Sequence, residues 1–589
     1  MKNVSSQRNL KQLIDCSMGR IPADLVIQDG TLVNVSIGKL VKNDCLAIKG
    51  DRIARINGGD EVIGSQTKVI DAADHIISPG FIDAHLHVES SLLTPTEFCR
   101  AVIPHGTTTV SIDPHEIVNV LGAKILDILL KEVDPLPLRF FIQIPSCVPS
   151  VSAFENAGAV LGASSVKKLL KNPDFIALAE MMNFPGVCSA DSEVLQKIEA
   201  AHSLNKIIEG HCPGLTGHEL DAYLAAGIGS DHESVTAEEA YEKLSKACKV
   251  AIRAGRFVND LRAIVNRIKL LPDLRNALFV ADDRHPNNLV EQGHLNENLK
   301  LAVAEGLDPV RAIQMITINP ATHFKINSDL GTLAPGKIAD IVVLKELTEF
   351  AVEGVIFAGR HIYHSNQFLV QFPSFNYPSW VLKSIKLTVP KEEDLVIQSG
   401  KKDSTVVRVI GIKEGSLYTK HLHEKIPVAN GAIMAVPNRD IFPLYVFNRY
   451  GHKTIGKGLV KGFGFKEPCA IASTVAHDSH NLICTGTDVS LILRAVEEIQ
   501  RINGGLCVVH SKTILSLPLP YGGLMSLEPL EAVSVRLQNL QDICQELGIK
   551  VTDPFMTLAF LSLPVIPALK LTDMGLVDVE QFKMCALEV

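Results

Sequence analysis

Histidine and carboxylate residues recur where the apolar runs of this chain end, and these residue types are common ligands of divalent metal ions. The first run ends in His85-Leu86-His87, and alternation along a strand turns both imidazoles to the same side. One H-x-H pair is weak evidence, because most histidines are structural. The pattern repeats, however, at later run ends, which carry Glu180, His211, Asp231-His232 and Asp282-Asp283. Together these residues predict a metal centre.

Four imidazoles and two carboxylates supply enough donors for two divalent ions, with the Glu180 carboxylate bridging them. A water shared by two cations forms hydroxide readily at neutral pH, which is the nucleophile of many hydrolases. Asp282 and Asp283 are adjacent, so their side chains diverge if both lie on the strand. We expect one of them to bind metal and the other to carry a proton or contact substrate. The residues alone leave open which does which.

Four other polar residues are candidates for the same site. Glu89, His115 and Glu116 follow the first two runs on the same rim, where Glu89 and Glu116 could protonate a substrate and His115 and Glu89 could hold it. Hydrogen bonding within loops is the competing interpretation. Arg284 is either a substrate-binding cation or a surface charge. The later segment His477-Asp478-Ser479-His480 could hold a metal or line a site, but a surface or turn position is the favoured expectation.

The elements that must position these residues form an alternating pattern. Eight apolar runs end in polar residues, and helical segments separate most of them. Thr236 and Glu239 predict a capping box at the start of one such helix. Alternating strands and helices favour a parallel sheet, and eight repeats predict a (β/α)8 barrel whose reactive groups lie at the strands' carboxyl ends. The runs are HIISPGFIDAHLH, TTTVSIDPHE, LRFFIQIPS, FIALAEMMN, KIIEGHCP, GIGSDHE, VAIRAG and ALFVADD.

Short β-rich runs with turn signals lie on both sides of this repeat, at residues 24–71 and 331–363. We therefore expect an α/β protein whose barrel, residues 77–328, is accompanied by a small β-sandwich domain built from residues 1–76 and 329–385. Residues 386–589 have mixed strand and helix patterns and are expected to form a C-terminal α/β domain. A chain of 589 residues is long enough for several cores.

Composition narrows the class of protein further. The formal net charge of −8 and dispersed basic residues argue against a nucleic-acid partner. Twelve cysteines without a C-x-x-C pair favour a reducing compartment. The first twenty residues lack a secretory pattern, and the longest apolar stretch, residues 555–569, contains two prolines and is too short to span a membrane. We expect a cytoplasmic enzyme that acts on a small molecule without a membrane partner.

Several motifs resemble a known family. PGFIDAHLH and NPATHF with GTLAPGKIADIVVL resemble the amidohydrolase superfamily across residues 24–363. HLHVESS, PHGTTTVSIDPHEIVNVLG, ALAEMMNFPGV and VADDRHP resemble its adenine deaminases, as do the C-terminal AHDSHNL and LPLPYGGLMS, so the resemblance covers nearly the whole chain. It implies purine salvage through hydrolysis of adenine to hypoxanthine and ammonia, in a homo-oligomer expected to be a dimer.

The resemblance also implies a set of site residues. It implies two bound divalent ions, Mn²⁺ by preference with Fe²⁺ or Zn²⁺ as alternatives, and an aspartate at the eighth strand that takes a proton. Glu180 stands where many members of the superfamily have a carboxylated lysine, and the run from Phe175 to Asn183 contains no lysine. The implied metal ligands are His85, His87, Glu180, His211, His232 and Asp282.

Two competing functions remain open at this point. A cyclic-amide hydrolase similar to dihydroorotases or hydantoinases would use the same barrel and hydroxide, but the absent lysine and the deaminase-like segments count against it. A non-catalytic barrel scaffold would usually have lost metal ligands, whereas this chain keeps a full set. Release of ammonia from adenine, tested against adenosine, cytosine and dihydroorotate, distinguishes all three, because ring opening without ammonia favours the cyclic-amide hydrolase and inertness favours the scaffold.

Overall fold

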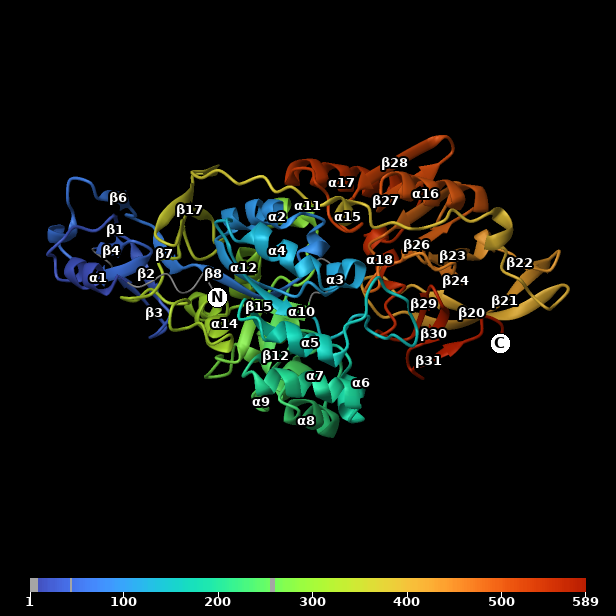
Figure 1. The fold of residues 1–589 in the computed structure, drawn as a ribbon, viewed down its shortest axis with the longest axis horizontal. Helices are drawn as coiled ribbons and strands as arrows, with labels where there is room; N and C mark the ends of the chain where they lie inside the picture. The colour runs from blue at the N-terminus through green and yellow to red at the C-terminus, as the bar shows by residue number, and fades with distance from the viewer. Residues whose placement is uncertain (1–8, 43–44, 255–259) are drawn as a thin grey trace.

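The computed structural model describes residues 9–42, 45–254 and 260–589. Figure 1 shows three parts along the long axis, with a small β domain at one end, a barrel in the middle and the C-terminal domain at the other end. No helix within the described residues has the length and hydropathy needed to cross a bilayer.

The central part is a barrel of eight parallel strands among the described residues. Its first five strands form one sheet and its last three another, and every pair within them is parallel. Two backbone hydrogen bonds close the ring, from Asp282 N to His85 O at 3.1 Å and from Gly229 N to Ile208 O at 3.0 Å. The strands are β8 (Phe81–Leu86), β9 (Thr107–Ile112), β10 (Arg139–Ile144), β11 (Phe175–Met181), β12 (Ile207–Gly210), β13 (Ser230–Asp231), β14 (Lys249–Arg253) and β15 (Ala277–Val280).

Helices cover the outside of this barrel. The strands are buried on both faces, which is why they read as nearly continuous apolar runs. At the start of α9 the Thr236 hydroxyl accepts a hydrogen bond from Glu239 N at 3.2 Å, as the capping box predicts. Between the strands lie α2 (Pro95–Val102), α3 (His115–Leu121), α4 (Ile125–Val133), α5 (Ala163–Leu170), α6 (Phe184–Cys188), α7 (Ser192–Ser203), α8 (Gly217–Ala225), α9 (Ala237–Ser245) and α10 (Asp260–Ile268), and after β15 come α11 (Pro286–Glu291), α12 (Leu295–Ala304), α13 (Pro309–Gln314) and α14 (Ile318–His323).

The first predicted barrel run is in fact two strands. Residues 76–79 form β7, which pairs with β16 of the small domain, and only residues 81–86 enter the barrel as β8. Gly80 lies between them, and a Cβ there would lie 2.2 Å from the Thr108 hydroxyl. The glycine therefore permits the chain to pass from one domain to the other at close backbone approach.

The small domain is a sandwich of two sheets drawn from both sides of the barrel. One sheet has the order β5-β4-β1-β6, the other β19-β18-β17-β16-β7-β2-β3, and apolar side chains of both sheets share a core. Its elements are β1 (Leu25–Gln28), β2 (Thr31–Asn34), β3 (Lys39–Lys42), β4 (Cys45–Lys49), β5 (Arg52–Ile56), β6 (Lys68–Asp71), β7 (Ile76–Pro79), β16 (Ile341–Leu344), β17 (Val352–Phe357), β18 (Arg360–His364) and β19 (Gln367–Phe368), with α1 (Leu10–Ser17) beside them.

The C-terminal domain contains a nine-stranded sheet, covered by helices, and a small sheet of three strands. It packs on the barrel, with which it shares a hydrophobic core, and Asn156 of the barrel donates from its side chain to Asp573 at 2.7 Å. Its elements are α15 (Ser379–Leu382), β20 (Ser404–Gly411), β21 (Lys420–Ala429), β22 (Ala432–Ile433), β23 (Ile441–Phe447), β24 (Ile455–Lys461), β25 (Cys469–Ser473), β26 (Leu482–Gly486), α16 (Val489–Arg501), β27 (Gly505–His510), β28 (Thr513–Pro518), α17 (Leu530–Glu546), α18 (Pro554–Phe560), β29 (Leu569–Thr572), β30 (Gly575–Asp578) and β31 (Lys583–Cys585).

Candidate active site

The six residues predicted to bind metal converge at one end of the barrel. They lie at or just beyond the carboxyl ends of five strands, and each is at most 7% exposed. Strand β8 carries two of them, and β11, β12, β13 and β15 one each, so residues almost 200 positions apart meet at one place. They are His85, His87, Glu180, His211, His232 and Asp282.

Glu180 is the centre of this cluster. Its Oε2 lies 2.7 Å from His211 Nδ1 and 3.1 Å from His232 Nε2, while its Oε1 lies 3.5 Å from His87 Nε2. Burial alone would raise the pKa of Glu180, but His232 and His211 lower that pKa well below its ordinary value. A carboxylate with imidazoles on both oxygens is placed to contact two cations.

His85 and Asp282 complete the cluster. Asp282 Oδ1 lies 3.4 Å from His85 Nε2 and 3.6 Å from His87 Nε2. The backbone of Asp282 has a φ of +54°, a left-handed conformation that costs energy and is often found at functional sites. His85 stacks on His232, with ring centroids 3.9 Å apart.

The donor set fits divalent cations. The ligand atoms of His85, His87 and Glu180 lie within 4.8 Å of one another, as do those of Glu180, His211 and His232. His87 Nδ1 donates to the Asp113 carbonyl at 3.0 Å, which leaves the lone pair of a neutral ring on Nε2, toward the cluster. Among the described residues, His85 Nε2 has no hydrogen-bond partner although it is buried. Cations would satisfy these atoms.

The two neighbouring aspartates have different surroundings. Asp282 belongs to the ligand cluster, whereas Asp283 Oδ1 accepts a hydrogen bond from the Ser90 hydroxyl. Ser90 also lies 3.2 Å from Glu116 Oε1 and so connects the two carboxylates. Burial, and then the charge of Asp282, raise the pKa of Asp283 above its ordinary value. This environment makes Asp283 a stronger base than an ordinary aspartate.

Arg253 and Glu233 also belong to the site, although the sequence analysis did not select them. Arg253 donates to Asp282 Oδ2 at 2.7 Å and contacts both oxygens of Glu233, at 2.5 and 2.9 Å. All three are buried, so the guanidinium fixes the orientation of Asp282 through paired charges in a region of low dielectric. The one feature of the sequence that could have identified them as site residues is their position at strand ends, in the runs GIGSDHE and VAIRAG.

Two predicted substrate contacts do not line the central cavity. The Arg284 guanidinium donates to the carbonyls of Gly293 and Ala254, each at 2.9 Å, and to Asn298 Oδ1 at 2.8 Å, so it ties together the backbone behind β15. Glu89 lies behind Glu116, and its Oε1 accepts from Ile117 N at 3.1 Å. His115 and Glu116 do line the cavity.

The C-terminal domain supplies polar groups to the site. Residues 477–479 form a turn, as expected, but the turn is buried, so the alternative expectation of a surface position is wrong. These residues are at most 4% exposed. His477 Nδ1 lies 3.1 Å from Glu116 Oε1, and Asp478 Oδ1 lies 3.7 Å from His115 Nε2. The polarity of the segment indicated the turn. Its burial depends on packing against His115 and Glu116 of the barrel, which lie more than 300 residues earlier in the chain.

The resulting cavity has a volume of about 400 Å³. Its polar side is the ligand cluster with Asp283, His115 and Glu116, and its apolar side comes largely from the C-terminal domain. We call this apolar side the roof; its residues are Leu417, Phe560, Leu563 and Ile566. The roof shields part of the site from water, which strengthens the electrostatic interactions there.

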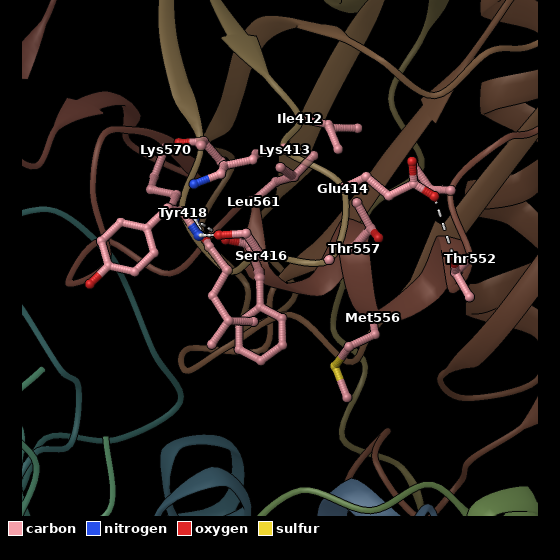
Figure 2. A pocket seen from close by; sticks show the side chains of 15 residues that line it. Ile412, Lys413, Glu414, Ser416, Tyr418, Thr552, Met556, Thr557, Leu561 and Lys570 are labelled. Carbon is pink, nitrogen blue, oxygen red and sulfur yellow. Dashed lines mark hydrogen bonds between the residues drawn. The ribbon is translucent and has the colours of Figure 1, made fainter. Parts of the chain in front are cut away.

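A buried lysine holds the roof from behind. Lys570 Nζ donates to the carbonyls of Leu417 and Phe560, at 3.0 and 2.8 Å, in a second pocket of about 670 Å³. Figure 2 shows Lys570 beside Ser416 and Tyr418 of the loop that carries Leu417. No salt bridge to Lys570 occurs within the described part of the chain, and burial lowers its pKa to about 7.

The pKa of Lys570 predicts a dependence of stability on pH. Between about pH 7 and the ordinary lysine pKa of about 10.4, the unfolded chain binds a proton that the folded chain does not. The free energy of unfolding should therefore rise with pH across this window, by up to about 1.4 kcal/mol per unit from this group. In Lys570→Met this contribution should be absent. Urea unfolding at pH 7, 8 and 9 should therefore show the free energy of unfolding of wild type increasing relative to that of the variant. The control is Lys413→Met, at an exposed position of the same pocket. Equal pH dependence of wild type and Lys570→Met would contradict the prediction.

Comparisons with known proteins show the family of this chain. Residues 76–362 match the Amidohydrolase family, and residues 416–583 match the Adenine deaminase C-terminal domain. The adenine deaminase of Moorella thermoacetica is 41% identical over 583 residues, which cover 98% of each chain. That of Dehalococcoides mccartyi is 41% identical over 586 residues, covering 99% of this chain and all of the relative. A solved structure of molinate hydrolase, 15% identical, covers 58% of this chain and 95% of its own with a TM-score of 0.44. From the two full-length relatives and the two matched families together, the chain belongs to the adenine deaminase family of amidohydrolases.

Proposed function

We propose that this chain hydrolyses adenine to hypoxanthine and ammonia as a step of purine salvage. The observation that carries the proposal is the buried cluster of four histidines and two carboxylates, enclosed by a C-terminal domain of the adenine deaminase type. The cavity has both polar and apolar walls, which suits a planar heterocyclic base.

The six clustered side chains would hold two divalent cations, Mn²⁺ by preference. When bound, such cations lower the pKa of a coordinated water and so supply a nucleophile at neutral pH. Glu180 would contact both cations, and Arg253 would keep Asp282 oriented toward them. Because Glu180 is a carboxylate by nature, this arrangement needs no carbon dioxide to modify a lysine.

The chain's own groups would move the protons. Asp283 lines the cavity, and its raised pKa suits it to accept the proton released when water adds to C6 of the base. Asp283 would then return that proton to the departing amine. His115 has a pKa well above its ordinary value, because Asp113 and Asp478 outweigh the effect of burial, so it would donate a hydrogen bond to a ring nitrogen. Glu116 would hold His477 in place.

The proposal is tested by ammonia release. Apo-protein loaded with Mn²⁺ should release ammonia from adenine, with about two equivalents of metal per chain, and should be inactive toward adenosine, cytosine and dihydroorotate. Opening of dihydroorotate without ammonia would favour a cyclic-amide hydrolase instead. Inertness toward every substrate would favour a scaffold. We further propose a cytoplasmic homodimer, which sedimentation of the loaded protein and fractionation of cells would test.

A further inference from the structure

Two residues of the C-terminal domain carry unused hydrogen-bonding capacity in the cavity. His477 and Asp478 lie between β25 and β26, are 4% and 3% exposed, and line the cavity. Within the described ranges, His477 Nε2 and Asp478 Oδ2 have no hydrogen-bond partner. A buried polar atom left unpaired costs about 1–3 kcal/mol, and more when it is charged. These atoms therefore indicate a ligand contact.

The position of the pair relative to the ligand cluster is fixed by His115. His115 Nδ1 lies 3.4 Å from Glu180 Oε1, and its Nε2 lies 3.7 Å from Asp478 Oδ1. A single imidazole ring thus separates the metal side of the cavity from Asp478. A purine whose C6 faces the ligand cluster would direct its opposite edge toward His477 and Asp478.

The two unpaired atoms have complementary chemistry. Asp478 Oδ2 is an acceptor. The Glu116 carboxylate lies 3.1 Å from His477 Nδ1 and, although burial opposes it, raises the pKa of His477 to about 9, so Nε2 carries an N–H. The edge of a free purine opposite C6 presents an acceptor, N3, beside a donor, N9–H. In a nucleoside the sugar replaces that hydrogen.

We propose that Asp478 accepts a hydrogen bond from purine N9–H while His477 donates to N3, which makes Asp478 a determinant of specificity for the free base over N9-substituted purines. This inference rests on the proposed adenine deamination. Phe560 stacks on His477 with centroids 4.7 Å apart and an interplanar angle of 11°, and so holds the imidazole in position. A buried carboxylate that is left unpaired disfavours a substrate that cannot donate to it.

The test compares adenine with 9-methyladenine. Wild-type enzyme loaded with Mn²⁺ should favour adenine in kcat/KM by at least about a thousandfold. Asp478→Ala should lower kcat/KM for adenine by about a hundredfold and for 9-methyladenine by less than about threefold, so the ratio collapses. Asp478→Asn, which keeps an oxygen acceptor without the charge, should have an intermediate ratio. Inhibition constants of hypoxanthine and 9-methylhypoxanthine provide the same comparison without turnover.

Ser479→Ala is the matched control, because Ser479 is equally buried in the same segment but does not line the cavity. Its ratio should equal that of wild type. A merely structural role of Asp478 would lower activity on both bases alike, so an unchanged ratio in Asp478→Ala and Asp478→Asn overturns the inference while wild-type deamination stands. If wild type releases no ammonia from adenine, the proposed function falls first and this inference with it.

Discussion

Glu180→Gln should lower kcat for adenine by at least about a thousandfold and reduce the metal content below two equivalents. Glu180 is the residue that the imidazoles at four different strand ends contact, through one oxygen or the other. Glutamine preserves the shape but removes the charge, and its amide nitrogen cannot ligate a cation. The variant therefore loses one of the two ligand atoms and the charge that balances two cations in a buried site. Metal analysis and steady-state kinetics of the Mn²⁺-loaded protein measure the two effects.

Glu209→Gln is the control for this substitution. Glu209 is also a buried strand residue, on β12, and it pairs with His323 Nε2 at 2.5 Å, but it does not line the cavity. Neutralising it should cost some stability while leaving two equivalents of metal and kcat within a few fold of wild type. Near-normal turnover in Glu180→Gln with both metals retained would contradict the assignment of Glu180.

The barrel half of the site could be predicted because of its topology. In a parallel barrel every strand's carboxyl end opens at the same mouth, so polar residues that terminate apolar runs must converge. Grouping His85, Glu180 and His211 into one site therefore required no knowledge of long-range packing. The helix start at Thr236 could be predicted for a similar reason, since a cap depends on neighbouring residues only.

The remaining part of the site depends on contacts that no local pattern encodes. Residues 477–480 are buried because the C-terminal domain packs on the barrel, and their polarity, which correctly indicated a turn, could not indicate that burial. The sequence left Arg284 open between a substrate-binding cation and a surface charge, whereas its guanidinium is buried and donates to carbonyls behind β15. The run at residues 76–86 concealed a domain boundary, because β7 and β8 are both apolar and only Gly80 marks the change of sheet.

Asp283→Asn should lower kcat by about 10²–10⁴-fold while both metals remain bound and KM changes little. Asp283 lies outside the ligand cluster and is hydrogen-bonded to Ser90, so its replacement leaves the cation donors intact. Asparagine has nearly the same shape but cannot accept a proton from the attacking water. The loss should therefore fall on the chemical step, which pre-steady-state measurement of hypoxanthine formation isolates from product release.

Asp282→Asn is the informative comparison, because the two residues are adjacent and differ in what they contact. Asp282 lies 3.4 Å from His85 Nε2 and pairs with Arg253, so its neutralisation should release metal as well as lower kcat, and added Mn²⁺ should restore part of the activity. Added Mn²⁺ should restore nothing in Asp283→Asn, since no ligand is missing there. If instead Asp283→Asn loses metal and Asp282→Asn retains it, the roles of the two aspartates are exchanged, and Asp282 must carry the proton.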